Sequence, residues 1–337
     1  PPREEAVEAN KKCEEAGIKT VMITGDHKLT ATAVAKEIGI MKENSIVLTG
    51  AELDNMTDEE FEKIVEKVAV YARVSPEHKL RIVKALKKKG HIVAMTGDGI
   101  NDAPALKKSD IGVAMGITGT DVTKDASDMI LADDNFATIV AAVYEGRGIF
   151  ENIRKYLTYL LSANIGEILV MAAAGLVALP LPLLAKHLLF VNLATDGLPA
   201  LALGTDPPDP RIMEKPPRNP KEGMFATVQG WLVGIALLLL AATSAAFIYG
   251  LVSYGWTFTT PLAIAELKAR SMVFATMVFF EIFFAFSCRS FDRTFFTVGP
   301  FGNKSLLVVV LGQAVLMPFL FQVPLLASLF SVTALEP

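Results

Sequence analysis

The chain has 337 residues, of which 52% are hydrophobic and 20% charged, and its formal net charge is −4. Residues 1–150 hold 20 of the 32 Lys and Arg residues and 25 of the 36 Asp and Glu residues. This uneven charge excludes one uniform soluble domain, and the apolar content excludes a disordered chain. The negative net charge also argues against nucleic acid as a partner. We therefore expect a soluble domain in residues 1–150 and a membrane domain in residues 151–337.

Strands and helices alternate along the first part. The predicted strands are 18–24, 68–71, 91–96, 111–115 and 129–132. The predicted helices are 30–38, an acidic and solvated one at 57–67, and one that opens at Pro76 and ends at Gly90. Strands joined by helices indicate a parallel sheet and a Rossmann-like α/β fold. His27, His78 and His91 follow no ligand pattern and are interpreted as surface or edge residues.

Two of the predicted strands end in the same tripeptide, Thr-Gly-Asp, at 24–26 and 96–98. Ligands of open α/β sheets bind beyond the carboxyl ends of the strands. An aspartate at such an end can hold Mg²⁺, and hydroxyl and backbone N–H groups can hold phosphate. Lys79, at the start of a helix, can neutralise phosphate charge. One Thr-Gly-Asp is a common turn, but two of them with the run TGDGINDAPAL are far more specific.

Four segments of this part carry a family resemblance: MITGD (22–26), ARVSPEHK (72–79), TGDGINDAPALK (96–107) and ADDNFATIVAAVYEGR (132–147). They resemble the phosphorylation domain of P-type cation-transporting ATPases, which has a haloacid dehalogenase-like α/β fold. The resemblance implies that Mg²⁺ and ATP are cofactors. It assigns Mg²⁺ binding to Asp98, phosphate contacts to Thr24, Gly25, Lys79 and Asn101, and loop ordering to Asp26 and Asp102.

The sequence lacks several parts that are typical of the family. The acceptor motif Asp-Lys-Thr-Gly-Thr does not occur in the 337 residues. The nucleotide-binding domain, which would bind most of the ATP, and the actuator domain are also not recognisable. We expect a C-terminal fragment of a longer pump, containing part of the phosphorylation domain and inactive alone.

Five apolar stretches of the second part are long enough to span a membrane, which takes about 20 residues. The predicted spans are roughly 153–178, 183–204, 228–252, 270–288 and 305–325. The connectors 205–227 and 289–304 are rich in Lys and Arg and fall on the same side as the soluble domain. The positive-inside rule then makes that side cytoplasmic. We expect a multi-pass protein of a bacterial cell membrane, with the bilayer as a partner and no obligate protein partner evident.

Polar side chains inside the predicted spans are costly and indicate function. They share helix faces and offer hard oxygen ligands, as Ca²⁺ prefers. They are Asn164, Glu167, Asn192, Thr195, Asp196 and Glu281. Gly197 and Pro199 predict a break of the helix after Asp196, which would free backbone carbonyls. Hydrogen bonding between helices would explain Asn or Thr alone, but not three carboxylates without a cationic partner.

The segments YLLSANIGE (159–167) and LLFVNLATDGLPALALG (188–204) resemble the fifth and sixth helices of calcium pumps of the sarco/endoplasmic reticulum type. By this resemblance Asn164, Glu167, Thr195, Asp196 and Glu281 would form one Ca²⁺ site, and Asn192 and Asp196 would contribute to a second. A carboxyl group left in the membrane without its cation favours the neutral form, so H⁺ is the expected counter-ion.

These features together predict part of an ATP-driven pump that exports Ca²⁺ from the cytoplasm through an aspartyl-phosphate intermediate. Two alternatives stay open. One is a pump of the same family for Na⁺, K⁺ or Mn²⁺. The other is a membrane-anchored phosphatase with the same soluble fold.

Overall fold

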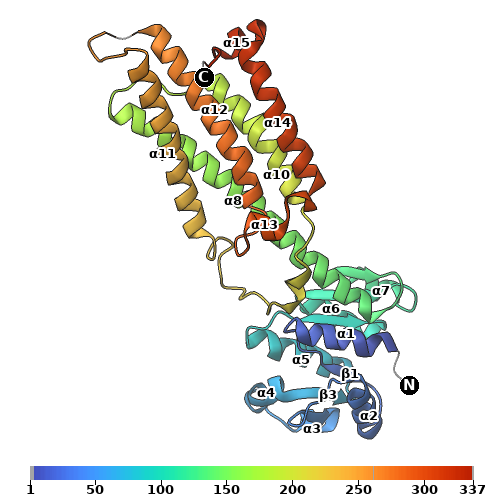
Figure 1. Ribbon diagram of the computed structural model, residues 1–337. Coiled ribbons are helices and arrows are strands. Elements are labelled where there is room, and N and C mark those ends of the chain that lie inside the picture. The colour runs from blue at the N-terminus through green and yellow to red at the C-terminus, as the bar shows by residue number, and fades with distance from the viewer. Residues whose placement is uncertain (1–3, 261, 336–337) are drawn as a thin grey trace. The chain divides into compact units, whose positions relative to one another are not determined.

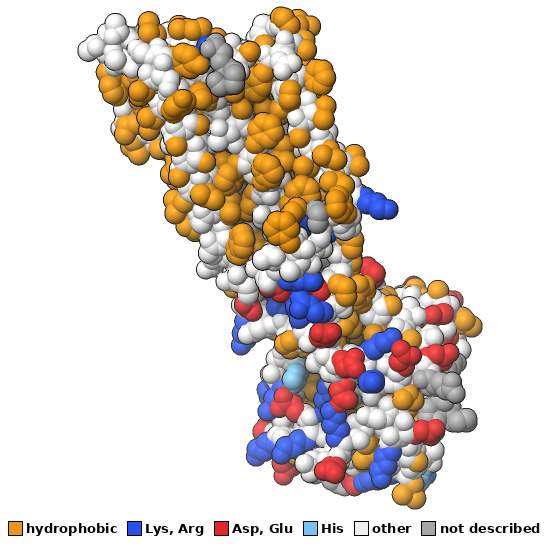
Figure 2. Space-filling model, in the orientation of Figure 1, with side chains coloured by type: hydrophobic (Ala, Val, Ile, Leu, Met, Phe, Trp, Pro, Cys, Tyr) orange, Lys and Arg blue, Asp and Glu red, His pale blue; other side chains and the backbone are white. Residues whose placement is uncertain are grey.

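The computed structural model describes residues 4–260 and 262–335. These residues divide into two compact units, which are described separately (Figure 1). Unit 1 comprises residues 4–146 and 209–221, and unit 2 comprises residues 147–208 and 222–335. In Figure 2 the Lys, Arg, Asp and Glu side chains gather over unit 1, whereas hydrophobic side chains cover unit 2.

The strands of unit 1 are all parallel, as the alternation of strands and helices predicts, but they form two three-stranded sheets within the described residues. The strand orders are β1-β3-β2 and β4-β5-β6. The strands are β1 (Met22–Thr24), β2 (Ile46–Thr49), β3 (Val68–Ala72), β4 (Ala94–Gly97), β5 (Ile111–Met115) and β6 (Met129–Leu131). In the central strand β3 every residue is buried, which fits its run of apolar side chains.

The helices of unit 1 are short, and all but the first and the last of them lie between strands in the chain. They are α1 (Glu4–Glu15), α2 (Lys28–Ile38), α3 (Gly50–Asp54), α4 (Asp58–Ile64), η1 (Val65–Lys67), α5 (Pro76–Lys88), η2 (Ile100–Asp102), α6 (Ala103–Lys108), α7 (Asp121–Asp125) and η4 (Pro210–Glu214). The acidic helix predicted at 57–67 is not only a solvated face. Phe61 and Val65 are each 1% exposed and belong to the core, because residues four apart lie on the same face of a helix.

The start of α5 corrects the interpretation of His78 as a surface residue. Ser75 and His78 form a capping box: the Ser75 N–H donates to Nδ1 of His78, and the His78 N–H donates to Oγ of Ser75. His78 is buried, and its Nε2 lies 2.7 Å from Oδ1 of Asp54. A histidine can therefore close a helix start that the sequence pattern assigns to Glu or Gln.

Unit 2 is a bundle of helices. Its elements are α8 (Phe136–Leu176), of which residues 136–146 belong to unit 1, α9 (Ala185–Phe190), η3 (Val191–Asp196), α10 (Gly197–Gly204), α11 (Gln229–Ser253), α12 (Ala263–Ser287), α13 (Phe295–Val298), η5 (Pro300–Gly302), α14 (Lys304–Gln322) and α15 (Pro324–Phe330). Within the described residues, five segments are long and apolar enough to cross a membrane: Phe136–Leu176, Ala185–Gly204, Gln229–Ser253, Ala263–Ser287 and Lys304–Gln322.

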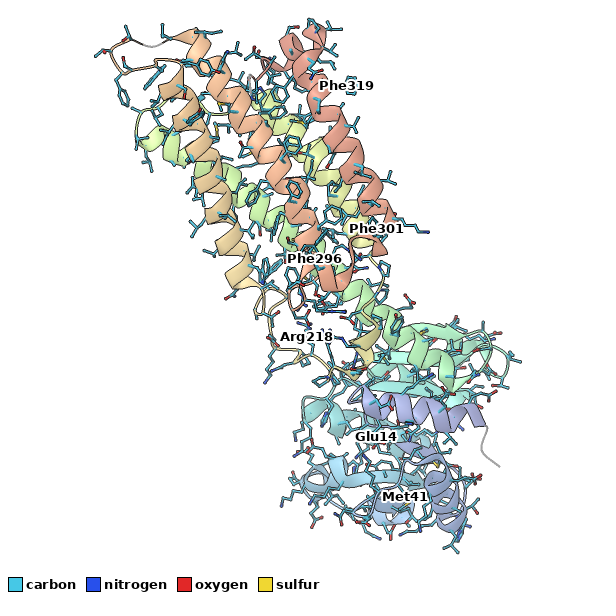
Figure 3. The ribbon with its side chains drawn as sticks, in the orientation of Figure 1. Glu14, Met41, Arg218, Phe296, Phe301 and Phe319 are labelled. Atoms are coloured by element: carbon cyan, nitrogen blue, oxygen red, sulfur yellow. The ribbon has the colours of Figure 1, made fainter. Side chains whose placement is uncertain are left out.

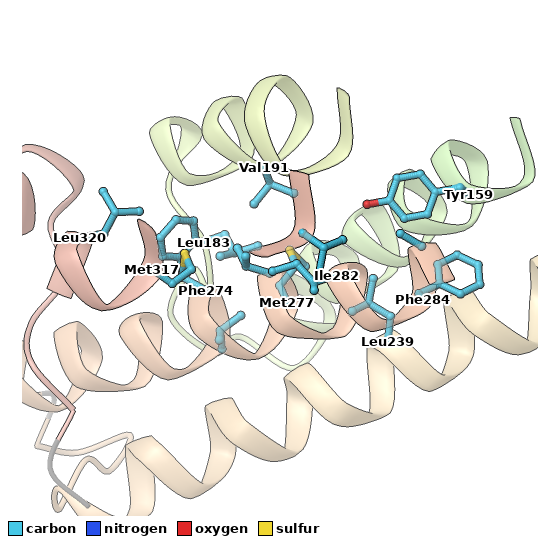
Figure 4. Close-up of a cluster of buried hydrophobic side chains, with 14 of the residues drawn as sticks. Tyr159, Leu183, Val191, Leu239, Phe274, Met277, Ile282, Phe284, Met317 and Leu320 are labelled. Carbon is cyan, nitrogen blue, oxygen red and sulfur yellow. The ribbon is translucent and has the colours of Figure 1, made fainter. Parts of the chain in front are cut away.

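Helix α12 lies at the centre of this bundle. It packs most closely on α11, where a Cβ added at Gly250 would lie 2.7 Å from Cα of Ala269. Small residues allow such close approach between membrane helices. Phe274 and Met277 of α12 are fully buried and lie in the cluster of Figure 4, whereas Phe319 on the outside of α14 is 54% exposed (Figure 3).

Candidate functional site

The first candidate site lies at the carboxyl ends of β1 and β3 in unit 1. Thr24 ends β1, and its hydroxyl donates to Oδ2 of Asp26 at 3.0 Å and accepts the Asp26 N–H at 3.1 Å. The N–H of Arg73, which has φ +50°, donates to the carbonyl of Asp26 at 3.2 Å. Beside Gly25 the space where a Cβ would stand is open. The first Thr-Gly-Asp turn is therefore joined to the ARVSPEHK segment and offers exposed backbone and hydroxyl groups.

The second Thr-Gly-Asp turn follows β4 and holds an ion pair. Lys79, in the first turn of α5, donates to Oδ1 of Asp102, whose side chain is 5% exposed. A Cβ at Gly97 would lie only 2.5 Å from Cβ of Asp102, so glycine is required for this approach. The Gly99 N–H also donates to Oδ2 of Asp102 at 3.4 Å. Asp102 thus contacts both the turn and Lys79, and the loop-ordering role that the resemblance implies for it stays a prediction.

Asp98 and Asn101 are both exposed in the same turn. In the part of the chain that the structure describes, their side chains make no hydrogen bond or ion pair with the other predicted residues. The backbone carbonyl of Asp98 accepts the N–H of Thr120 at 3.1 Å, which joins this turn to the start of α7. This hydrogen bond fixes the backbone of Asp98, and its exposed carboxylate is accessible to a ligand.

Asp134 anchors the loop after β5. It accepts the N–H groups of Ile117 at 2.9 Å and Thr118 at 2.8 Å, and the Thr118 hydroxyl at 2.7 Å. These hydrogen bonds, that of Ile117 first, lower the pKa of Asp134 to about 2. Asp134 has φ +49°, a backbone conformation that Asp adopts more readily than most residues.

The second candidate site is a cluster of three buried carboxylates inside unit 2. Glu167 of α8, Asp196 of η3 and Glu281 of α12 each offer an oxygen, and these oxygens lie within 4.8 Å of one another. Their exposed fractions are 5%, 0% and 0%. Among the described residues no Lys or Arg forms an ion pair with any of them. Three acidic groups so close in an apolar bundle require a cation or protons.

Neutral donors hold one oxygen of each carboxylate in this cluster. Asn192 donates to Oε2 of Glu167 at 2.9 Å, Tyr159 donates to Oδ1 of Asp196 at 3.2 Å, and Thr195 donates to Oε2 of Glu281 at 3.4 Å. Three other oxygens are buried without a partner: Oε1 of Glu167, Oδ2 of Asp196 and Oε1 of Glu281. The arrangement leaves one oxygen per carboxylate for a ligand.

A π-helical turn positions Asp196. The sequence predicts a helix break here, but η3 continues directly into α10, so that expectation is wrong in form. Pro199 has no N–H to donate to the carbonyl of Thr195, four residues earlier. Tyr159 and Gln313 donate to that carbonyl instead, at 3.1 and 3.3 Å. The carbonyl of Thr195 therefore lacks its α-helical donor even though the helix is not broken at this point.

Tyr159 and Gln313 are site residues that the sequence interpretation missed. In Figure 4 the hydroxyl of Tyr159 points into the bundle. Gln313 of α14 is 5% exposed, donates to the carbonyl of Ala194 at 2.8 Å, and has a buried Oε1 without a partner. A signal was present for Gln313, since it is a polar residue inside an apolar span.

The two predicted asparagines differ in their placement. Asn192 is exposed, yet it contacts Glu167. Asn164 is half-buried, and its amide donates to the carbonyl of Leu160 in its own helix at 2.7 Å. Among the described residues the structure shows no hydrogen bond from Asn164 to the carboxylates, so its assignment as a ligand stays a prediction.

Two family descriptions match the chain. Residues 1–110 match "haloacid dehalogenase-like hydrolase", and residues 180–337 match "Cation transporting ATPase, C-terminus". The first match confirms the predicted haloacid dehalogenase-like fold.

Individual relatives match nearly the whole chain. A "Calcium-transporting ATPase" of Bacillus subtilis is 51% identical over 100% of this chain and 37% of its own length. A "Probable cation-transporting ATPase F" of Mycobacterium tuberculosis is 42% identical over 100% of this chain and 37% of its own length. A "Calcium-transporting ATPase 1" of Saccharomyces cerevisiae is 42% identical over 95% of this chain and 34% of its own length.

The chain therefore spans little more than a third of the length of these relatives. The matches cover residues of both units. The predicted resemblance is confirmed, and the chain belongs to the P-type cation-transporting ATPases.

Proposed function

We propose that the chain is part of a pump that uses ATP to export Ca²⁺ from the cytoplasm. The observation that carries this proposal is the buried cluster of Glu167, Asp196 and Glu281, whose oxygens lie within 4.8 Å of one another. Ca²⁺ takes about 6–8 hard oxygen ligands, and unpaired carboxylate oxygens are the kind it prefers. The names of the Bacillus subtilis and Saccharomyces cerevisiae relatives support Ca²⁺ as the cargo.

The remaining predicted ligands complete the proposed site. Thr195 and Asn192 already contact two of its carboxylates, and Asn164 would add an amide oxygen after a change of rotamer. The carbonyl of Thr195 is a further hard oxygen within the same turn. When Ca²⁺ leaves, burial favours protonation of carboxylates, so H⁺ would be carried back.

The proposed site in unit 1 would bind a phosphoryl group. Lys79 would neutralise phosphoryl charge, with Asp102 holding its position, while Thr24, Gly25 and Asn101 would bind phosphoryl oxygens. Asp26 orients the Thr24 hydroxyl, as their hydrogen bonds indicate. The acceptor aspartate would be that of the Asp-Lys-Thr-Gly-Thr motif, outside these 337 residues.

Mg²⁺ fits this site as a cofactor. Asp98 presents an exposed carboxylate, engaged by no other side chain in the described residues, at the carboxyl end of β4. Hard oxygen donors at such a position suit Mg²⁺. When bound, the ion would supply positive charge against the transferring phosphoryl group.

The membrane topology completes the proposal. We propose a bacterial cell membrane as the location, with residues 1–150 as a phosphorylation domain in the cytoplasm and residues 151–337 as the cation-transport domain. The Lys and Arg residues in the connectors between spans support this orientation, because positive loops stay on the cytoplasmic side.

The test compares two amide substitutions in the full-length protein reconstituted in vesicles. Changing an outer-shell partner of a metal typically costs about 10–100-fold in affinity. Asp196→Asn, which removes a central ligand charge, should weaken Ca²⁺ activation of ATP hydrolysis by more than about 100-fold. Glu281→Gln keeps an amide oxygen and should cost about 10-fold. The measurement is ATP hydrolysis and Ca²⁺ uptake against Ca²⁺ concentration.

A matched control lies on the same helix as Glu281. Glu266 pairs with Arg270 at 2.9 Å near the start of α12, away from the cluster. Glu266→Gln should keep the parental Ca²⁺ dependence. Parental Ca²⁺ dependence in Asp196→Asn would refute the site. Stimulation by Na⁺, K⁺ or Mn²⁺ but not Ca²⁺ would favour another cation pump, and cation-independent hydrolysis of phosphate esters would favour the phosphatase.

A further inference from the structure

A second buried charge cluster lies in unit 2, away from the three carboxylates. Its centre is Asp206, two residues after α10, which is 4% exposed. Lys155 of α8 donates to Oδ2 of Asp206 at 2.8 Å. Arg289, just after α12, donates through Nε to Oδ1 at 2.9 Å, and Asn303 donates to the same oxygen at 3.0 Å. One carboxylate thus holds side chains from three other segments.

Further hydrogen bonds fix the members of this Asp206 cluster. Asn152 of α8 donates to the backbone carbonyl of Asp206 at 2.6 Å and accepts Nζ of Lys155 at 3.1 Å. Asn303 is the N-cap of α14 and accepts the N–H of Leu306 at 2.8 Å. The cluster therefore joins α8, α10, the end of α12 and the start of α14.

The charges of the cluster are buried almost completely. The exposed fractions of the side chains are 8% for Lys155, 6% for Arg289 and 3% for Asp206. Two cations share one carboxylate, so removal of that carboxylate would leave two buried positive charges without compensation. Breaking a buried ion pair from one side is strongly destabilising, so the Asp206 carboxylate holds these segments together.

The same four segments carry the candidate cation site. Glu167 follows Lys155 on α8 by a helical rise of about 18 Å, at 1.5 Å per residue. Glu281 lies about 9 Å of helical rise before the end of α12 at Ser287, and Arg289 follows two residues later. Asp196 lies on the segment that leads into α10, and Gln313 of α14 bonds to that segment. The Asp206 cluster therefore joins the middle of α8 to the segment after α10, the segment after α12 and the start of α14.

We propose that Asp206 is a positioning residue for cation binding, an inference that rests on the proposed function of the carboxylate cluster. Asp206 touches no cargo. It sets the spacing of α8, α10 and α12, and thereby the distances between Glu167, Asp196 and Glu281. A cation that needs several oxygens at once is sensitive to these distances, because a ligand displaced along its helix no longer reaches the ion.

The test uses Asp206→Asn in the full-length protein and measures phosphoenzyme formation from ATP against Ca²⁺ concentration. The amide keeps the shape of the side chain but removes the charge that holds Lys155 and Arg289. Couplings carried through packed networks reach about 2–30-fold, so we expect half-activation at about 10-fold higher Ca²⁺. The maximal phosphoenzyme per folded protein should change little, because the phosphate site is intact.

A double variant tests whether charge is the cause. Asp206→Asn with Lys155→Gln removes one charge of each sign, so one buried cation remains in excess, as in the parent. Half-activation should then return to within about threefold of the parental Ca²⁺ concentration, since contacting residues couple energetically. Glu151→Gln is the control: Glu151 pairs with Arg154 at 2.6 Å on the same helix, outside the Asp206 cluster, and should leave half-activation unchanged.

Two outcomes would overturn the inference. One is parental half-activation in Asp206→Asn, and the other is a loss of maximal phosphoenzyme without a shift in half-activation, which indicates a merely structural role. If Asp206→Asn does not fold, Lys155→Gln alone decides: it leaves Arg289 and Asn303 on Asp206 and should shift half-activation about threefold in the same direction. No shift would again overturn it.

The variant Asp196→Asn, measured in parallel, separates the two levels of the argument. If Asp196→Asn loses Ca²⁺ activation while Asp206→Asn keeps the parental curve, the proposed site stands and Asp206 does not position it. If both variants keep the parental curve, the proposed site itself fails.

Discussion

At the scale of single residues, the carboxylate cluster is oriented by neutral groups and not neutralised by them. Asn192, Tyr159 and Thr195 each occupy one carboxylate oxygen with a hydrogen bond. A neutral donor fixes the rotamer but leaves the charge of an ionised carboxylate in place. A lysine or arginine in the same position would neutralise the carboxylate charge permanently. Neutral hydrogen-bond donors therefore suit a site at which a cation binds reversibly.

One residue in the soluble unit gives a pH-dependent prediction. Its hydrogen bonds lower the pKa of Asp134 to about 2, below the value of about 3.9 for an unfolded chain. A depressed pKa contributes stability that is complete above the unfolded value and is lost as pH falls toward the folded value. Asp134→Asn should lower the unfolding midpoint by about 2–4 °C at pH 6.

The difference between parent and Asp134→Asn should shrink as the pH is lowered from 4 toward 2. Thermal unfolding of the purified protein, parent and variant side by side, measures it at each pH. A difference that stays constant from pH 6 to pH 3 would show that the charge of Asp134 does not hold the loop.

At the scale of elements, the turn η3 is where the helix geometry departs from the ordinary α pattern. π-helical turns are rare and frequently occur at functional sites. Here Pro199 leaves the carbonyl of Thr195 without its intrahelical donor, and Tyr159 and Gln313 bind it from two other helices. The wider turn places Asp196 beside Glu167 and Glu281.

Pro199→Ala tests this explanation. Alanine supplies an N–H that can reach the Thr195 carbonyl and favours a regular α-helix, which would rotate Asp196 away from the other carboxylates. We expect half-activation by Ca²⁺ to rise at least about 10-fold, as for the loss of a supporting partner. Ca²⁺ titration of ATP hydrolysis in the full-length protein measures it. Pro324→Ala, at the exposed start of α15, is the matched control, and a parental curve for Pro199→Ala would argue against the role of the proline.

The sequence predicts the elements better than it predicts their ends. The strand at 111–115 is confirmed without change, because an apolar run bounded by turn residues defines it. The strand predicted at 18–24 is only Met22–Thr24 in the structure, since the apolar residues before it pack without joining the ladder. The strand Ile46–Thr49 was not predicted, although its apolar run is about as long as the one that predicts the strand at 68–71.

The candidate sites show the same limit. Charge inside an apolar stretch is visible in a sequence, so Glu167, Asp196 and Glu281 could be singled out and are found together. The contribution of Tyr159 depends on a carbonyl freed by a proline on another helix, which no local pattern reveals. The Asp206 cluster was missed for a related reason, since its members lie far apart in the chain and near or just beyond the ends of the predicted spans.

At the scale of the whole molecule, one helix belongs to both units. Residues 136–146 of α8 lie in unit 1 and residues 147–176 in unit 2. This helix carries Lys155 and Glu167, and its first residues follow the segment that contains Asp134. A continuous helix transmits rotation and translation along its length, because each residue is hydrogen-bonded to the next turn. We therefore expect α8 to couple the proposed phosphate chemistry of unit 1 to the proposed cation binding in unit 2.

Insertion of two glycines between Gly146 and Arg147 tests this coupling in the full-length protein. Glycine costs about 1 kcal/mol per residue in a helix interior, and two extra residues rotate the following part by about 200°. ATP hydrolysis should persist, while Ca²⁺ transported per ATP should fall at least about fivefold, because the helix is weakened where the units join. Gly146→Ala strengthens the helix at the same place without changing its register and should keep the parental ratio. The measurement is Ca²⁺ uptake and ATP hydrolysis in the same vesicles. A parental ratio in the insertion variant would mean that the coupling runs through another segment.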